Sequence, residues 1–93
     1  MNFDHLVETP VYWRGTVLSV NARPPGFSVI IRADNEFRGY KRLSANNRDF
    51  PSGTLVHVGD TVKFLPGTKS KPRALPKAHN VEIVQKKIRK TDN

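Results

Sequence analysis

The sequence predicts one all-β domain, a small barrel of five antiparallel strands. With 93 residues, the chain is too short to build two separate hydrophobic cores. Short apolar runs rich in β-branched residues alternate with clusters of Gly, Pro and Asn, which is the pattern of strands and turns. Helical periodicity is nearly absent, and its one weak instance, residues 84–90, is short and charged. These observations together favour an all-β architecture.

Each strand is bounded by residues that favour turns. Residues 22–26 (ARPPG) predict a stiff turn, because two prolines fix φ and the glycine can adopt positive φ. The polar residues 33–36 predict the next turn, and residues 44–58 a long connection with Asn, Pro and Gly. Strands are therefore expected at residues 12–20, 27–32, 37–43, 61–65 and 78–84.

Two barrel folds fit five short strands, the OB-fold and the SH3-like barrel. The long connection between the third and fourth strands favours the OB-fold, and the SH3-like barrel stays the alternative. We expect the domain to span residues 12–85, with an N-terminal extension at 1–11 and a basic tail at 86–93.

The charge of the chain indicates a polyanionic partner. Lys and Arg number 16 against 8 Asp and Glu, a formal net charge of +8. Residues 37–48 and 67–77 carry basic side chains and no acid, which predicts a basic face. The alternative is a scatter of solvated charges without a partner.

Several function classes are disfavoured. With no Cys, the chain has no disulfide or thiolate metal site, and a secreted domain of this size would usually need such staples, so we expect a cytoplasmic protein. No apolar run approaches the ~20 residues of a membrane helix, and residues 1–10 lack the pattern of a signal peptide. The three histidines are scattered, and neither a nucleophile elbow nor a phosphate-binding glycine loop is present. We therefore expect no enzyme, metal or cofactor.

Five short motifs occur in one order along the chain, and together they resemble the cold-shock domain. That family has a five-stranded OB-fold and binds single-stranded RNA and DNA, which is what the resemblance implies here. The motifs are residues 15–21 (GTVLSVN), 25–30 (PGFSVI), 39–45 (GYKRLSA), 55–64 (LVHVGDTVKF) and 76–81 (PKAHNV).

The resemblance implies a set of nucleic-acid-binding residues. Phe27 and Tyr40 keep aromatic rings at two positions where the family stacks bases, and they are expected to form one surface. Arg42 stands where the family has a His, and its planar guanidinium can also stack on a base. The loops that flank the binding face would supply phosphate contacts, from Arg23 in one loop and from Lys69, Lys71 and Arg73 in the other.

The sequence also departs from the family. Ser19, Val29 and Leu43 stand where the family has aromatic rings. Two functions are therefore expected from the sequence. The first is a small basic protein that binds single-stranded RNA or DNA. The alternative is a protein-interaction module, an inhibitor or adaptor that has lost base stacking and docks on an acidic partner. The sequence leaves the oligomeric state open.

Overall fold

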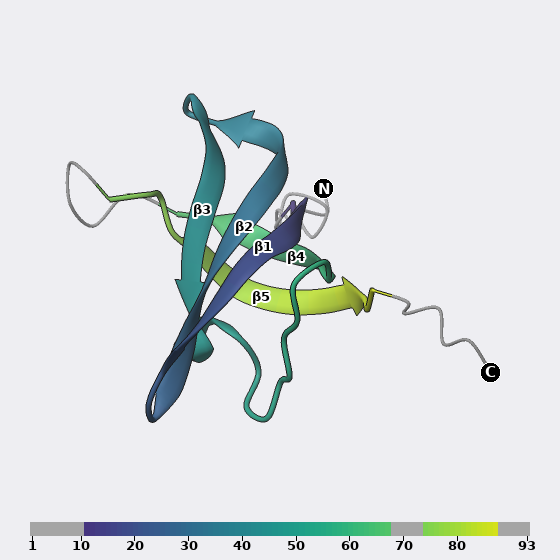
Figure 1. The fold of residues 1–93 in the computed structure, drawn as a ribbon. Helices are drawn as coiled ribbons and strands as arrows, with labels where there is room; N and C mark the ends of the chain where they lie inside the picture. The colour runs from purple at the N-terminus through teal and green to yellow at the C-terminus, as the bar shows by residue number, and fades with distance from the viewer. Residues whose placement is uncertain (1–10, 68–73, 88–93) are drawn as a thin grey trace, which may run out of the picture.

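A computed structural model describes residues 11–67 and 74–87. They form one five-stranded antiparallel sheet with the strand order β3-β2-β1-β4-β5 (Figure 1). The all-β prediction is confirmed. The elements are β1 (Trp13–Arg23), β2 (Gly26–Phe37), β3 (Tyr40–Asn46), a 3₁₀ turn η2 (Asn47–Asp49), β4 (Thr61–Pro66) and β5 (Ala78–Gln85).

The closed barrel expected from the sequence is not observed. The edge strands of the sheet are β3 and β5, and among the described residues they are joined by one isolated parallel bridge between Ser44 and Lys77. The N–H of Ser44 donates to the carbonyl oxygen of Pro76 at 2.9 Å. The sheet therefore curls until its edges meet at one point, but no continuous ladder closes it.

The first hairpin turns within the predicted range, and the second turns later than the sequence predicts. The first turn consists of Pro24 and Pro25 alone, so β1 continues to Arg23. The turn expected at residues 33–36 is wrong, because β2 runs through this segment and ends at Phe37. The chain reverses at Arg38 and Gly39, whose φ angles are +53° and +86°. Positive φ at both central residues is what a tight two-residue hairpin requires.

Alternating apolar residues place the core on one face of the sheet. On β2, Val29 and Ile31 are fully buried and Ala33 is buried. Arg32, which stands between Ile31 and Ala33, is exposed. The two ends of the core are covered by aromatic rings. Trp13 meets Phe37 edge-to-face at 5.6 Å between ring centroids. The remaining buried apolar residues are Val17, Ala33, Leu43, Ala45, Phe50, Val62, Phe64, Ala78 and Val81.

In its described part, residues 84–87, the weak helical pattern at residues 84–90 does not form a helix. Residues 84 and 85 belong to β5, residues 86 and 87 are irregular, and the rest lie outside the described residues. Within the described part of the chain, no helix is long and apolar enough to span a membrane.

Candidate nucleic-acid interface

Two arginines lie directly opposite each other on the exposed face of the sheet. The register of β2 and β3 pairs Arg32 with Arg42, and both are exposed. The N–H of Ser44 points away from β2 toward Pro76. Ser44 therefore occupies a non-hydrogen-bonded position of the β2–β3 ladder. Arg42, two residues before Ser44, occupies the same kind of position. Cα atoms of such pairs are about 4.5 Å apart, and their side chains are the closest in the sheet.

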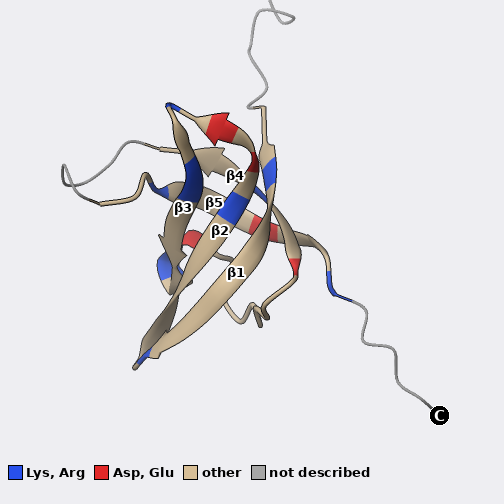
Figure 2. Cartoon of the chain, turned by 45° about the horizontal axis from the view of Figure 1, so that its top comes forward, with Lys and Arg blue, Asp and Glu red and all other residues tan. Residues whose placement is uncertain are grey.

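No described carboxylate forms an ion pair with Arg32 or Arg42, although Asp34 and Glu36 line a surface hollow together with Arg32. The ion pairs found among the described residues join His79 to Asp49 and Lys86 to Asp60. Figure 2 shows basic segments of β2 and β3 lying side by side. Like charges directly opposite each other destabilise a sheet by roughly 0.2–1 kcal/mol. An anion that both guanidinium groups contact would remove this repulsion.

The arginine pair begins a row of polar residues that crosses all five strands. Each pair of neighbours in the row is directly opposite in the register. Four strand spacings of about 4.8 Å give the row a length of about 19 Å. It contains hydrogen-bond donors and no acid, and we call it the donor row. Its members are Arg42, Arg32, Thr16, Thr61 and Gln85.

The next row of the same face contains an acid as well as cations. Arg14 lies opposite Lys63, and Lys63 lies opposite Glu82. The Lys63 ammonium also lies over the Tyr12 ring, 4.9 Å from its centroid. Of these two rows, the donor row is the one that holds cations without an acid.

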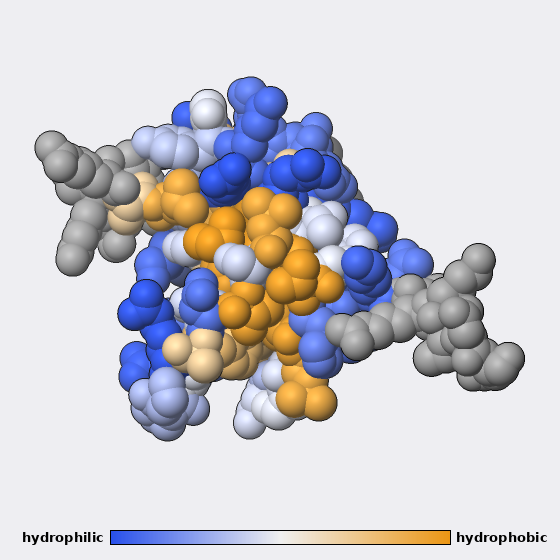
Figure 3. Space-filling view, in the orientation of Figure 1, coloured by the Kyte–Doolittle hydropathy of each residue, from blue (hydrophilic) through white to orange (hydrophobic). Residues whose placement is uncertain are grey.

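Apolar side chains also reach the surface beside these polar rows. In the orientation of Figure 1, the space-filling view shows apolar residues gathered over the middle of the sheet with hydrophilic residues around them (Figure 3). The large apolar residues that are exposed include Leu18 at 37%, Val58 at 55% and Leu55 at 75%. The face therefore combines a cationic row with an apolar area.

The structure does not bring Phe27 and Tyr40 together, so the single surface expected of them is wrong. Ser28 lies opposite Asn46, which places Phe27 at the far end of β3 from Tyr40, about 20 Å away at ~3.3 Å per residue. Phe27 packs against the core, and its ring lies 5.5 Å from that of Phe50. Tyr40 is the first residue of β3, two residues before Arg42, so its half-buried side chain lies on the same face of the sheet as Arg42.

The predicted phosphate contacts are also separated. Arg23 lies at the Pro24–Pro25 end of β1, where its Nε donates to Ser28 Oγ at 3.3 Å, seven residues along the strand from Thr16 of the donor row. Lys69, Lys71 and Arg73 lie outside the described residues. The described ends of their loop lie at the β3 edge, because Gly67 N–H donates to the carbonyl oxygen of Lys77, the residue bridged to Ser44.

Two of the three positions that depart from the cold-shock pattern are core positions. Val29 and Leu43 are fully buried, so neither position could present a ring to a base. Ser19 lies opposite Ile30, and it shares the face of the sheet that carries the donor row. Of the three departures, Ser19 alone lies where a base could reach it.

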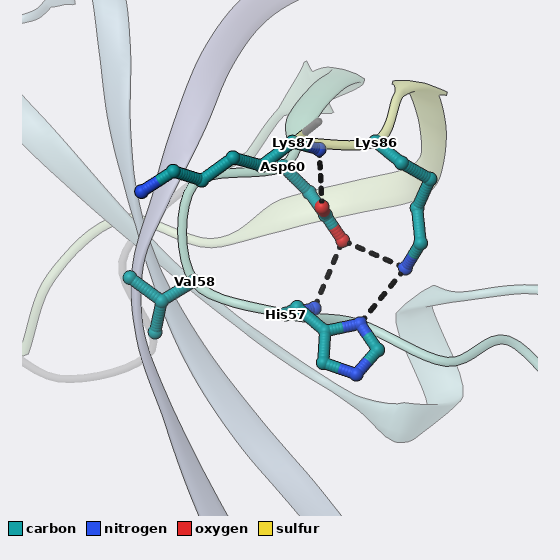
Figure 4. Close-up of a pocket in the computed structure, with 5 residues that line it drawn as sticks. All are labelled: His57, Val58, Asp60, Lys86 and Lys87. Atoms are coloured by element: carbon teal, nitrogen blue, oxygen red, sulfur yellow. Dashed lines mark hydrogen bonds and ion pairs between the residues drawn. The ribbon is translucent and has the colours of Figure 1, made fainter. Parts of the chain in front are cut away.

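A separate polar cluster surrounds Asp60, whose side chain is 1% exposed. The backbone N–H of His57 and that of Lys87 donate to its two carboxylate oxygens at 2.9 and 3.0 Å. The Lys86 ammonium donates to Asp60 Oδ2 and to His57 Nδ1 at 3.0 Å each, and to the Leu55 carbonyl oxygen at 2.7 Å. Figure 4 shows these groups converging while the Lys87 side chain extends away from the carboxylate.

These hydrogen bonds control the ionisation of Asp60. Burial by itself raises the pKa of the carboxyl, but the hydrogen bonds from Lys87, His57 and Lys86 outweigh it and lower the pKa below its ordinary value of 3.8. All three protons of the Lys86 ammonium are used within the cluster, so the surface hollow lined by these residues offers a ligand few free donors. Among the described residues, no group of His, Asp and Glu could hold a metal ion. The hydrogen bonds of Asp60 with His57, Lys86 and Lys87 join the C-terminal end of β5 to the segment before β4.

No family model, curated protein or solved structure matches the chain. The function therefore has to be inferred from the chemistry of the described surface.

Sequence reasoning missed Arg32 and the rest of the donor row apart from Arg42. Arg32 alternates with buried Val29 and Ile31 in the strand pattern, which could have marked it as outward-facing. Its pairing with Arg42 could not be predicted while the hairpin turn was placed at residues 33–36. The dipeptide Arg38-Gly39 was the signal that could have located the turn correctly.

Proposed function

We propose that the protein binds single-stranded RNA or DNA on the exposed face of β1, β2 and β3, without catalysis and without a cofactor. The observation that carries the proposal is the pair of directly opposed arginines, Arg32 and Arg42, neither of which forms an ion pair with a described carboxylate. Guanidinium groups match the geometry of phosphate oxygens and stay charged at any physiological pH. Because the pair repels itself in the free protein, a phosphate between the two groups gains both attraction and relief of that repulsion.

The shape of the sheet supports an OB-like, cold-shock-like fold as part of this proposal. The bond from Ser44 N–H to the Pro76 carbonyl oxygen brings the two sheet edges together as a barrel would. The same contact places Gly67 and Lys77 near Ser44 at the β3 edge, and Ser44 is two residues from Arg42. Phosphate contacts from Lys69, Lys71 and Arg73, which lie outside the described residues, stay a prediction from the sequence.

The proposed mechanism is mainly electrostatic. Phosphates lie along the donor row, where Arg42 and Arg32 neutralise charge and the hydroxyl groups of Thr16 and Thr61 donate hydrogen bonds. Association is expected to be fast, salt-dependent and weakly selective for sequence.

A second candidate is a module that docks on an acidic protein. The exposed apolar side chains Leu18, Leu55 and Val58 favour it, because protein interfaces combine an apolar centre with a charged rim. The two candidates differ in whether a nucleic-acid backbone is preferred to an acidic polypeptide of similar charge.

The test is a titration of a fluorescently labelled single-stranded oligonucleotide between ~50 and ~200 mM salt, the range in which phosphate contacts become visible. The parent protein is compared with Arg32→Gln and Arg42→Gln. Each variant should bind more weakly and should reduce the magnitude of the log K against log salt slope by about 0.7. The matched control is Arg14→Gln, because Arg14 belongs to the next row, which also contains the acid Glu82.

Two results would overturn the proposal. One is a parent protein whose affinity does not change with salt in this range. The other is an Arg14→Gln variant that loses as much affinity as Arg32→Gln and Arg42→Gln, because binding would then depend on net charge and not on this site.

A further inference from the structure

A row of aliphatic side chains lies beside the donor row on the same face of the sheet. The register pairs Val17 with Ile31 and Ser19 with Ile30, so Leu18 is the extra residue of a β-bulge. Leu18 is 37% exposed, whereas Val17 before it is 1% exposed. Alternation after the buried Val17 directs Leu18 away from the core, and the bulge lets the next residue, Ser19, lie opposite Ile30 on the same exposed face.

The segment that contains Val58 lies on the other side of β1 from β2, and Val58 also lines the hollow at the Asp60 cluster. The N–H of Val17 donates to the Asp60 carbonyl oxygen at 2.9 Å, and the N–H of Gly59 donates to the Val17 carbonyl oxygen at 2.8 Å. These bonds continue the pairing of β1 and β4 beyond Thr61, which brings the 58–60 segment alongside the bulge. Val58 is 55% exposed. We call Ile30, Leu18 and Val58 the aliphatic row.

We infer that the aliphatic row is the base-contacting surface of this protein, and that bases rest on Leu18, Ile30 and Val58 while their phosphates lie on the donor row. The inference rests on the proposed function and adds to it which residues contact the bases. It replaces the pair of aromatic rings expected from the sequence, which the structure separates.

The spacing of the two rows fits one nucleotide. Ile30 is two residues from Arg32, and Leu18 is two residues from Thr16. Two residues of a strand span about 7 Å. A base projects from its phosphate by the length of a sugar, so a backbone on the donor row places its bases over the next row of side chains.

The charge around the aliphatic row favours bases over an apolar protein segment as the occupant. Across β3, β2 and β1, the adjacent donor row presents Arg42, Arg32 and Thr16, which attract a phosphate backbone. Ser44 and Ser19 lie on either side of Ile30 in its own row, and their hydroxyl groups can donate to or accept from base edges. An apolar helix or strand would leave these polar groups unpaired, whereas a nucleotide pairs them.

The experiment compares two oligonucleotides of equal length and charge, one with bases and one abasic, at one salt concentration. The parent protein should bind the base-containing strand about five-fold more tightly or better. Leu18→Ser and Val58→Ser should each reduce this preference by about three-fold, because a partly buried aliphatic side chain is lost. Their salt slopes should equal that of the parent. Leu55→Ser is the matched control, since Leu55 is 75% exposed and lies outside the row.

The outcomes separate the inference from the proposed function. Equal affinity for the two strands with a normal salt slope overturns the inference and leaves the proposed function standing. If the protein binds neither the base-containing nor the abasic strand at low salt, the proposed function itself is overturned. Binding of polyglutamate as tightly as the base-containing strand overturns both in favour of an acidic protein partner. If Leu18→Ser does not fold, Leu18→Met keeps the side chain volume, and it should retain the preference.

Discussion

The ammonium group of Lys86 lies 3.0 Å from Oδ2 of Asp60, a carboxylate that is almost completely buried. The two residues are separated by 26 positions in the chain. Asp60 precedes Thr61, and Lys86 follows Gln85, so the contact holds together the last pair of the donor row. A buried carboxylate with all its bonds satisfied stabilises this end of the sheet, and removing one partner leaves the others unpaired.

Asp60→Asn should therefore lower the free energy of unfolding by about 1–3 kcal/mol. An amide nitrogen in place of one carboxylate oxygen would face a backbone N–H and could not accept its hydrogen bond. Urea denaturation at neutral pH measures the loss. Asp34→Asn, a change at an exposed acid, should have little effect, and equal losses for the two variants would contradict the role of Asp60.

The stability of the parent protein should fall in acid. Because the folded protein lowers the pKa of Asp60 below 3.8, the unfolded chain takes up a proton first as pH falls. The contribution of Asp60 is complete above the unfolded value and is lost as pH falls through the lowered folded value. Thermal unfolding from pH 6 down to pH 2.5 (roughly the range that brackets a carboxyl pKa) should show this loss, and Asp60→Asn should show less of it. Parallel curves for the two proteins would rule out the linkage.

Gly15→Ala should destabilise the fold by about 1–3 kcal/mol or more. A Cβ at Gly15 would lie 2.5 Å from the Arg32 carbonyl oxygen and 2.8 Å from Ile31 Cγ2, so β1 and β2 would have to separate. Thr16→Ala, on the exposed face of the same strand, should cost at most ~1 kcal/mol. Chemical denaturation of both variants provides the comparison, and a fully stable Gly15→Ala protein would show that the strands are not this close.

Phe27→Ala and Tyr40→Ala should act on different properties. Phe27 is half-buried against Phe50, so its loss should cost about 3 kcal/mol of stability, the lower end for a buried ring. The variant should keep its affinity for a single strand wherever it remains folded. Tyr40→Ala should weaken binding by ~1–3 kcal/mol, because Tyr40 lies on the face of Arg42 and its ring adds a stacking site to the aliphatic row. A folded Phe27→Ala protein with weakened binding would contradict this assignment.

Ser19→Trp should tighten single-strand binding by ~1 kcal/mol or more, about five-fold. Ser19 lies opposite Ile30 on the face of the donor row, so the indole would extend the surface offered to bases. Oligonucleotide titration of the variant measures the gain, with circular dichroism as the check on folding. A folded variant with the affinity of the parent would count against base contacts on this face.

The sequence predicts the strands better than it predicts where they turn. All five strands occur near the expected positions because β-branched runs such as VII at residues 29–31 favour strands wherever they lie. The second turn was misplaced because the polar residues 33–36 resemble a loop, yet the chain continues as strand there and reverses at Arg38 and Gly39. Exposed strand residues and turn residues are both polar, so composition alone does not distinguish them.

By itself, the sequence determined that this is one all-β domain with an excess of positive charge, because composition and local periodicity contain that information. Only the tertiary structure decided which charges meet. Arg32 and Arg42 face each other because the hairpin turns at Arg38 and Gly39 and not at residues 33–36. Phe27 and Tyr40 are separated for the same reason, since a change in register moves every cross-strand pair along the sheet. Cross-strand neighbours depend on how two segments align in space, and that alignment follows from core packing that no single segment specifies.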